Sequence, residues 1–260
     1  MAELREEDRG GARWLILDRP AQRNALTFTL LRELRAAFQR ADAEAGVRSI
    51  CLTGEGDKAF CSGMDFAAAA ESLAAGPTAA HEARRLYAGL LAEMARLGKP
   101  VVACVNGAAL AGGMGLLAAC DLAVAADDAR FGTPEVDVGL FPYMALAPVS
   151  RCIGRRAALE LFFTARKIDA AEALRLGLVN SVAPRAALAA RTQELLDVLA
   201  QKSPTALRLG RRAFYATQDL PYEAQLEALC AQLSINSQAE DAAEGAAAFL
   251  QKRKAEFKGR

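Results

Sequence analysis

The stretch that decides the fold is Val105-Asn-Gly-Ala-Ala-Leu-Ala-Gly-Gly-Met-Gly115, together with Phe131-Gly-Thr-Pro-Glu135. An apolar run typical of a strand ends at Asn106, and a glycine cluster then leads into a helix-like segment at residues 116–120. Glycine lets the backbone approach a ligand closely, and the free N–H groups at a helix start carry partial positive charge. This segment therefore suits a developing oxyanion, and Glu135 is a lone carboxylate placed as a general acid or base would be.

A second glycine motif, Ala59-Phe-Cys-Ser-Gly-Met-Asp65, follows another strand-like run. Short apolar runs of strand length alternate with helical patterns along the first half of the chain, which favours an α/β layered fold. The predicted strands are residues 14–18, 50–53, 101–105 and 122–126, and the predicted helices are residues 27–44, 66–70 and 79–97. Residues 71–78 contain a Gly-Pro pair and are predicted to form a mobile loop or lid.

From about residue 145 onward the strand signals vanish and helical patterns follow one another. The predicted helices are centred on residues 156–164, 170–176, 184–201, 204–216, 221–233 and 239–257. Several of them have proline in the first turn, where its missing N–H costs nothing. The residue pattern by itself therefore predicts an α/β region followed by an all-helical region.

Composition and charge exclude several classes of protein. The 260 residues suffice for one large core or one domain with an appendage. Lys and Arg number 32 against 31 Asp and Glu, so the net charge of +1 indicates neither a nucleic-acid partner nor a membrane partner. No apolar run is long enough to cross a bilayer. The charged residues 5–9 are unlike a signal peptide.

Cysteine and histidine usage points to a reducing compartment and away from metal chemistry. The 6 cysteines are scattered through apolar segments with no C-x-x-C pair, so we expect free thiols and a cytoplasmic protein. With 1 histidine and no clustered cysteines, a transition-metal site has almost no ligands to draw on. Neither a G-x-G-x-x-G nor a G-x-x-x-x-G-K-[ST] motif is present, so no dinucleotide or nucleoside triphosphate site is expected.

The motifs, in this order and at this spacing, resemble the enoyl-CoA hydratase/isomerase (crotonase) superfamily. The resemblance runs from Trp14-Leu-Ile-Leu-Asp-Arg-Pro20 to Ala246-Ala-Ala-Phe-Leu-Gln-Lys-Arg-Lys-Ala-Glu-Phe257, nearly the whole chain. It implies a crotonase-like spiral of ββα repeats at residues 1–200, which carries the acyl-CoA site, and a C-terminal helical oligomerisation region at residues 201–260. It also implies an acyl-CoA thioester substrate, no separate cofactor because coenzyme A is part of that substrate, and a homotrimer or homohexamer.

The resemblance further implies an oxyanion hole built from two backbone N–H groups. One donor would be Met64, directly after the glycine of the earlier motif, and the other would be Gly112, the middle residue of Ala111-Gly112-Gly113. Such donors aimed at a thioester oxygen contribute about 3 kcal/mol each in a dry pocket. Ala111 departs from the usual glycine but leaves Gly112 in place. Met64 would act through its backbone, so its side chain is expected to line the acyl pocket.

Hydratases of this superfamily usually carry two glutamates, and this chain keeps one of them. The second falls on Glu135, and the first falls on Gly115, a position expected to lie beside the acyl chain. With one carboxylate, a single group must serve both steps of hydration or move one proton between two carbons. The breadth of the superfamily slightly favours hydration of a 2-enoyl-CoA, whereas Gly115 favours 3-to-2 double-bond isomerisation. A non-catalytic acyl-CoA-binding paralogue is a third reading, which the retained Glu135 disfavours.

Coenzyme A needs an adenine slot and cations for its phosphates. Arg19-Pro-Ala-Gln-Arg-Asn-Ala25 resembles the adenine-side loop of the superfamily, in which Arg23 would meet phosphate and Asn24 would hold the turn through side-chain hydrogen bonds. Lys252 aligns with a lysine that reaches the coenzyme from a neighbouring subunit, although both cations also fit an ordinary surface role. The substrate- and CoA-binding candidates together are Arg23, Ala25, Ser62, Asp65, Phe66, Gly115 and Lys252.

Four other polar residues near the motifs have simpler explanations. Asp65 precedes a helix-like segment and Asp is a strong N-cap, so we expect a cap rather than a second acid. Asp121 starts a strand and His81 falls on a helix surface, so structural and solvated roles are expected for them. Asp137 would share a strand face with Glu135 if that segment were extended.

Overall fold

The computed structural model describes residues 3–260, so the first two residues of the expected core lie outside it. The strands are β1 (Leu4–Arg9), β2 (Ala12–Leu17), β3 (Ser49–Gly54), β4 (Ala59–Cys61), β5 (Val101–Val105), β6 (Ala108–Leu110), β7 (Leu122–Ala126), β8 (Arg130–Gly132), β9 (Ile168–Asp169) and β10 (Ser181–Ala183). The α-helices are α1 (Phe28–Ala43), α2 (Phe66–Ala74), α3 (Pro77–Met94), α4 (Gly112–Ala118), α5 (Tyr143–Cys152), α6 (Arg155–Thr164), α7 (Ala170–Leu176), α8 (Leu188–Ala200), α9 (Pro204–Thr217), α10 (Tyr222–Asn236) and α11 (Glu240–Leu250). Short 3₁₀ turns are η1 (Pro20–Gln22), η2 (Pro134–Val138) and η3 (Arg185–Ala187).

The strands form two sheets that rise together as a spiral. The larger sheet has the order β1-β2-β3-β5-β7-β10 and the smaller one has the order β4-β6-β8-β9. Three successive turns of the chain each give a first strand to the larger sheet (β3, β5, β7) and a second strand to the smaller one (β4, β6, β8). Strands of successive turns pair in parallel. This is the ββα spiral that the resemblance to the crotonase superfamily implies.

The smaller sheet determines where the glycine motifs meet. Its strands β4, β6 and β8 are parallel neighbours, so their carboxyl ends lie along one edge of the sheet. Each of the three strands is followed directly by one of the sequence motifs, at Ser62, Ala111 and Thr133. Segments that are far apart in the sequence are therefore brought to one place by strand pairing.

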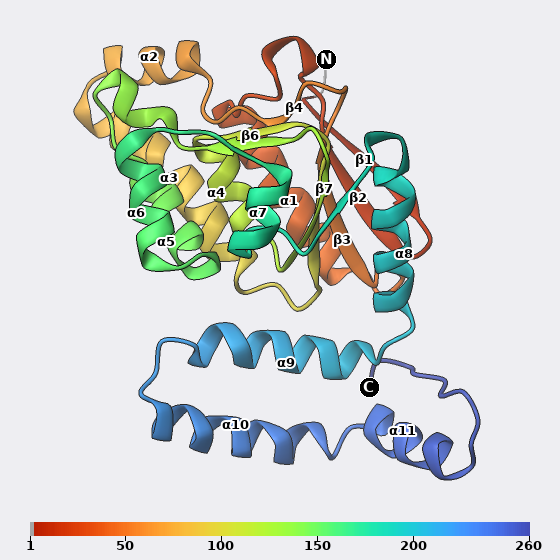
Figure 1. Cartoon of the computed structure of the whole chain (residues 1–260). Helices are drawn as coiled ribbons and strands as arrows, with labels where there is room; N and C mark the ends of the chain where they lie inside the picture. The colour runs from red at the N-terminus through yellow and green to blue at the C-terminus, as the bar shows by residue number, and fades with distance from the viewer. Residues whose placement is uncertain (1–2) are drawn as a thin grey trace.

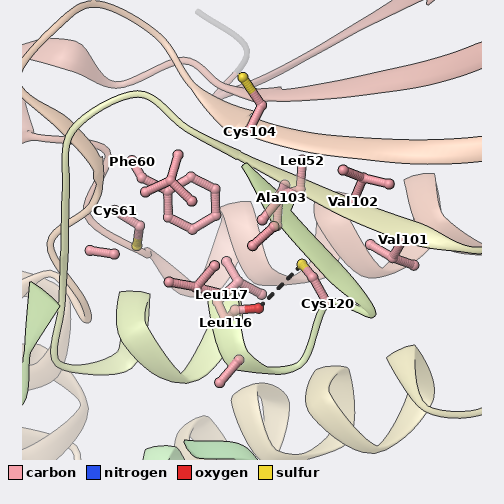
Figure 2. Packing of buried hydrophobic residues seen from close by; sticks show 14 of the residues in the cluster. Leu52, Phe60, Cys61, Val101, Val102, Ala103, Cys104, Leu116, Leu117 and Cys120 are labelled. Atoms are coloured by element: carbon pink, nitrogen blue, oxygen red, sulfur yellow. Dashed lines mark hydrogen bonds between the residues drawn. The ribbon is translucent and has the colours of Figure 1, made fainter. Parts of the chain in front are cut away.

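The core fills the space between the two sheets and the helices. Every residue of β3, β4 and β5 is buried. Figure 2 shows Phe60 of β4 and the leucines 116 and 117 of α4 packed near Val102 and Leu52 of the larger sheet. Four of the cysteines are buried in this region as free thiols, as expected of small apolar side chains: Cys51, Cys61, Cys104 and Cys120.

Several elements differ from the sequence prediction. Residues 71–78 are not a loop, because α2 extends to Ala74 and α3 begins at Pro77. The second half of the chain is not free of strands, because β9 and β10 each pair with a strand of the first half. Such two- and three-residue strands are too short for a periodic signal. The last helix ends at Leu250, well short of residue 257.

Helix α5 was not predicted, because Pro148 lies inside it and Pro142 precedes it. Proline lowers the expectation of a helix, although the first turn tolerates it. Proline marks a helix start as predicted at Pro204 of α9, whereas Pro77, predicted to lie in a loop, begins α3. The helix over residues 27–44 is also confirmed, with Thr27 as the N-cap of α1.

The last three helices form a separate layer. Figure 1 shows α9, α10 and α11 below the sheets and the helices α3–α6, with α8 leading down to them. Helix α9 is fixed to the core by Arg211, which donates to Asp121 and to backbone carbonyl oxygens at the end of α3. The carboxylate of Asp121 also accepts from the Val101 N–H and from the Tyr215 hydroxyl. The structural role expected for Asp121 is confirmed.

Candidate active site

The first glycine motif is held by a single parallel bridge. Leu26 donates its N–H to the Gly63 carbonyl oxygen at 2.8 Å and accepts from the Asp65 N–H at 2.9 Å, so it pairs with the residue between them, Met64. In this pairing the N–H of Met64 points away from Leu26. No acceptor lies within hydrogen-bonding distance of that N–H in residues 3–260. Met64 therefore presents a free backbone donor.

The second motif supplies a matching donor. Gly112 is the first residue of α4, and its N–H has neither an intrahelical acceptor nor a side-chain cap among the described residues. The preceding Ala111 adopts φ 52° and ψ −127°, a conformation rare for a residue with a side chain. This turn brings the Gly112 N–H out at the start of the helix.

The two motifs lie against each other through their glycines. A Cβ added to Gly63 would lie 3.1 Å from the Gly112 nitrogen and 2.8 Å from the Ala111 Cβ, and Gly63 itself has φ 97°. A Cβ on Gly113 would lie 2.1 Å from the Cys61 carbonyl oxygen. These glycines therefore allow a close approach that a side chain would prevent, and the donors at Met64 and Gly112 belong to one site.

Glu135 reaches the same region from the third strand of the smaller sheet. It lies in η2, whose start is anchored by the buried Thr133 hydroxyl on the Leu161 carbonyl oxygen of α6 at 3.3 Å. The Glu135 Oε2 atom is buried and has no hydrogen-bond partner among the described residues. Burial raises the pKa of this carboxyl above its ordinary value of 4.5. A half-buried carboxyl with a raised pKa and one unpartnered oxygen suits proton transfer.

The space next to Gly115, a position expected to lie beside the acyl chain, is occupied by side chains of other helices. Gly115 is buried, and a Cβ there would lie 2.6 Å from the Tyr87 hydroxyl oxygen and 2.9 Å from both the Cα and the Cβ of Ala145. A side chain at position 115 would therefore meet Tyr87 and Ala145, and its place beside the acyl chain stays a prediction. Gly115 allows α3 and α5 to pack closely on α4.

Tyr87 is a residue of this region that the sequence pattern did not single out. It lies on α3 and is 1% exposed, and its hydroxyl donates to the Gly112 carbonyl oxygen. A tyrosine on the apolar face of a helix gives no signal beyond core packing. The Gly115 position could have prompted a search for the side chain that replaces the missing glutamate.

Asp65 and Asn24 take the local roles expected of them, Asp65 as a helix N-cap and Asn24 as a turn-holding side chain. Asp65 caps α2 by accepting from the Ala67 and Ala68 N–H groups, and it forms an ion pair with Arg19 at 3.0 Å. Asn24 is fully buried, accepts from the Arg19 N–H and donates to the Ala59 carbonyl oxygen. The Asp65 carboxylate thus serves the fold and adds no second acid.

The segment proposed to meet coenzyme A adjoins the first motif. The Ser62 N–H donates to the Arg23 carbonyl oxygen at 3.1 Å, and the Arg23 side chain is exposed. Ala25 is buried beside it, whereas Phe66 is 78% exposed at the start of α2. A hollow of about 250 Å³ lies between residues 20–21 and residues 55–59, where Lys58 contributes a cation that the sequence analysis did not select.

Three candidates lie away from the paired glycine motifs. Lys252 is exposed and follows α11, which lies at the opposite end of the molecule from α2 (Figure 1). Asp137 is exposed, and because its segment is a 3₁₀ turn rather than a strand it does not share a face with Glu135. His81 is exposed on α3, as expected.

The described part of the chain shows neither a cluster of metal ligands nor a membrane-spanning helix. Across residues 3–260, no group of three or more His, Cys, Asp or Glu side chains is placed to hold a metal ion. None of the helices in the same range is both long and apolar enough to cross a membrane.

Comparison with known proteins identifies the family. The model of the family described as enoyl-CoA hydratase/isomerase matches residues 9–260. The chain belongs to this family. It is 33% identical over 256 residues to the mouse mitochondrial enoyl-CoA hydratase domain-containing protein 3, covering 98% of this chain and 83% of that one. It is 32% identical over 261 residues to the short-chain-enoyl-CoA hydratase of Clostridium acetobutylicum, covering 98% and 97%.

Solved structures of the enoyl-CoA hydratase/isomerase family share the whole fold. An enoyl-CoA hydratase of Mycobacterium smegmatis matches with a TM-score of 0.93 at 33% identity, covering 99% of each chain. An enoyl-CoA hydratase of Bacillus anthracis matches with a TM-score of 0.94 at 30% identity, covering 100% of each chain. The protein is therefore an acyl-CoA enzyme of the hydratase/isomerase type.

Proposed function

We propose that this enzyme isomerises a 3-enoyl-CoA to a 2-enoyl-CoA through a thioester enolate. The backbone N–H groups of Met64 and Gly112 would bind the thioester oxygen. Glu135 would remove a proton from C2, the electrons would pass to that oxygen as a dienolate, and the same carboxyl would return the proton to C4. The observation that carries this proposal is the contact of the two glycine motifs, with the Gly112 nitrogen 3.1 Å from a Cβ position on Gly63.

The environment of the donors and the base supports this chemistry. The two N–H groups have no acceptor among the described residues, so an oxyanion would not have to displace a protein hydrogen bond. Removing one donor of an oxyanion hole typically costs about 100- to 1,000-fold in kcat. Burial raises the pKa of Glu135, which makes its carboxylate a stronger base than an ordinary glutamate.

The choice of isomerisation rests on position 115. The Tyr87 hydroxyl and Ala145 fill the space next to Gly115, so the residue has no room for the first glutamate of two-glutamate hydratases. One carboxylate is enough to move a proton between C2 and C4, because no water has to be activated.

Hydration of a 2-enoyl-CoA is the second candidate, and the names of two relatives favour it. The Clostridium acetobutylicum relative is named a short-chain-enoyl-CoA hydratase, and a Proteus mirabilis relative with 34% identity is named a carnitinyl-CoA dehydratase. In that reaction Glu135 would activate the water and then supply the α-proton.

The experiment that tests the function is turnover of a 3-enoyl-CoA and of crotonyl-CoA, followed by thioester absorbance. Isomerisation predicts conversion of the 3-enoyl-CoA at a kcat/KM at least about 10-fold above that for hydration of crotonyl-CoA. A larger value for crotonyl-CoA would establish the second candidate instead, and turnover of neither would exclude both.

The oxyanion hole itself is tested by a matched pair of variants at Gly112. Gly112→Pro removes the N–H at the first helical position, where proline is tolerated. Gly112→Ala keeps the N–H, and its Cβ would make ordinary contacts of 3.7 Å with Gly63 and Tyr87. We expect folded Gly112→Pro to lose about 100-fold or more in kcat and Gly112→Ala to lose far less. Equal activity of the two would remove Gly112 from the hole.

Coenzyme A binding is proposed for the surface around the first motif. Ser62 and the exposed Phe66 lie two residues before and two residues after Met64 in the chain. Arg23 adjoins them because its carbonyl oxygen accepts from the Ser62 N–H. Arg23 would attract the phosphates. Lys58 lines its hollow together with the carboxylates of Glu55 and Asp57, so that hollow offers no net positive charge. Lys252 would contribute only from a neighbouring subunit. No cofactor beyond coenzyme A is proposed, because backbone donors and one carboxylate supply the chemistry.

We also propose a trimer or a dimer of trimers in the cytoplasm. The division into a core at residues 1–200 and an oligomerisation region at residues 201–260 belongs to this proposal. Exposed apolar side chains on α9–α11 support it: Phe214, Tyr222, Leu226, Leu233, Ile235, Phe249 and Leu250. The free cysteines agree with a reducing compartment, although the mouse relative is named as mitochondrial.

A further inference from the structure

The hydroxyl group of Tyr87 contacts the start of α4 in two ways. It donates a hydrogen bond to the Gly112 carbonyl oxygen, so it restrains the first turn of the helix. It also lies 2.6 Å from the position of a Cβ on Gly115 and 3.7 Å from the position of a Cβ on Gly112. One buried hydroxyl therefore borders both the proposed oxyanion donor and the glycine that replaces the first glutamate.

The surroundings of Tyr87 keep that hydroxyl protonated. Burial raises the pKa of Tyr87 well above its usual value of 10.0, and the Glu135 carboxylate acts in the same direction. Tyr87 is thus a neutral hydrogen-bond donor at working pH, unlike the carboxylate that a glutamate would bring.

We propose that Tyr87 is a positioning and specificity-determining residue of this site. Through the Gly112 carbonyl oxygen its hydroxyl holds the peptide unit between Gly112 and Gly113, and so restrains the backbone of Gly112, whose own N–H lies on the other side of the Gly112 Cα. Its presence beside Gly115 keeps a second carboxylate out of the site, which leaves proton transfer to Glu135. The proposal rests on the function proposed above, because it concerns the same oxyanion hole.

The direct test is Tyr87→Phe, which keeps the ring and removes the hydroxyl. A conjugated dienoyl-CoA such as 2,4-hexadienoyl-CoA absorbs at longer wavelength when its carbonyl oxygen accepts strong hydrogen bonds, so its spectrum reports on the hole. We expect Tyr87→Phe to reduce this red shift and to lower kcat about 10- to 100-fold, the range for a misplaced catalytic group. KM should change by less than about 3-fold, since coenzyme A binding lies elsewhere.

The matched control is Tyr215→Phe. It removes a hydroxyl that is also hydrogen-bonded to a partly buried partner, Asp121, but on α9 and away from the glycine motifs. It is expected to lower the melting temperature without changing the red shift or kcat. If Tyr87→Phe behaves like Tyr215→Phe, with a stability loss and an unchanged spectrum, the positioning role is excluded.

The specificity role is tested by a double-mutant cycle with Gly115→Ala. In the wild type the new Cβ would meet the Tyr87 hydroxyl at 2.6 Å, whereas in Tyr87→Phe that contact is absent. Gly115→Ala is therefore expected to lower the melting temperature less in Tyr87→Phe than in the wild type. Equal losses in both backgrounds would show that Ala145, rather than Tyr87, excludes a side chain at this position.

The outcomes separate this inference from the proposed function. Absence of any dienoyl-CoA red shift in the wild-type protein would overturn the oxyanion hole and the role of Tyr87 with it. A wild-type red shift that Tyr87→Phe retains in full would overturn the role of Tyr87 alone. If Tyr87→Phe fails to fold, Tyr87→Trp and Tyr87→Leu, which also lack the hydroxyl, replace it, and retention of the full red shift by a folded variant overturns the role of Tyr87.

Discussion

At the scale of single residues, Glu135 combines burial with the lack of a partner, and its ionised form is therefore disfavoured. Because burial raises its pKa in the folded state, its contribution to stability is full below 4.5 and is lost as the pH rises through the raised value. Proton abstraction needs the ionised carboxylate, which becomes populated as the pH rises through the same raised pKa. We expect kcat to fall on acidification with a midpoint above 4.5, measured as a pH–rate profile.

Glu135→Gln separates the two effects at this residue. It keeps the shape of the side chain and removes the ionisable group, so kcat should fall about 100-fold or more. The variant should be more stable than the wild type at neutral pH, where the wild type holds a buried carboxylate, and the difference should vanish near about pH 4. Urea unfolding at the two pH values measures this. Near wild-type turnover of the variant would remove Glu135 from the mechanism.

Ala111 provides a second residue-scale prediction. Its φ of 52° and ψ of −127° suit glycine, and such a conformation costs a residue with a Cβ about 1–3 kcal/mol. Glycine adds about 0.4–1 kcal/mol of unfolded-state entropy, which offsets part of the gain. Ala111→Gly should therefore raise the unfolding free energy by about 1 kcal/mol, measured by chemical denaturation. A lower stability would mean that the Ala111 Cβ contributes packing that outweighs its backbone strain.

At the scale of elements, the attachment of α9 to the core depends on one carboxylate. Asp121 accepts from Arg211, whose side chain is 7% exposed, and from Val101 and Tyr215. Asp121→Asn would leave the Arg211 charge without its counter-ion, and we expect a loss of about 3 kcal/mol in the unfolding free energy. Asp219→Asn breaks an exposed pair with Arg151 and serves as the control, with a loss below about 1 kcal/mol. Equal losses would refute a special role for Asp121.

At the scale of the whole molecule, the C-terminal layer presents apolar side chains that the monomer leaves uncovered. Leu226, Leu233 and Phe249 are 50%, 67% and 83% exposed. We expect light scattering to give about three or six times the monomer mass of 27.6 kDa. Leu233→Asp should lower that mass, because it places a charge in an apolar interface. Ser237→Asp, at the exposed residue that follows α10, should not. A wild-type mass of one monomer would contradict the trimer.

The sequence by itself determined the elements and the motifs that carry the chemistry. Apolar runs at residues 101–105 and 122–126 are strands because their side chains are buried, and the glycines after β4 and β6 mark close backbone approaches. The N-cap role of Asp65 and the turn role of Asn24 were also predictable, because Asp65 accepts from the Ala67 N–H and Asn24 accepts from the Arg19 N–H, both nearby in the chain. Such features are local or are repeated along the chain, and so they leave a pattern.

Only the tertiary structure decided what stands beside Gly115. Whether a glycine leaves space or closes a contact depends on side chains from other elements, here Tyr87 of α3 and Ala145 of α5. The same reason explains the missed strands β9 and β10, which are defined by their partners rather than by their own residues. Close packing is a property of surfaces that meet in three dimensions, and no periodicity along one chain segment encodes which surfaces will meet.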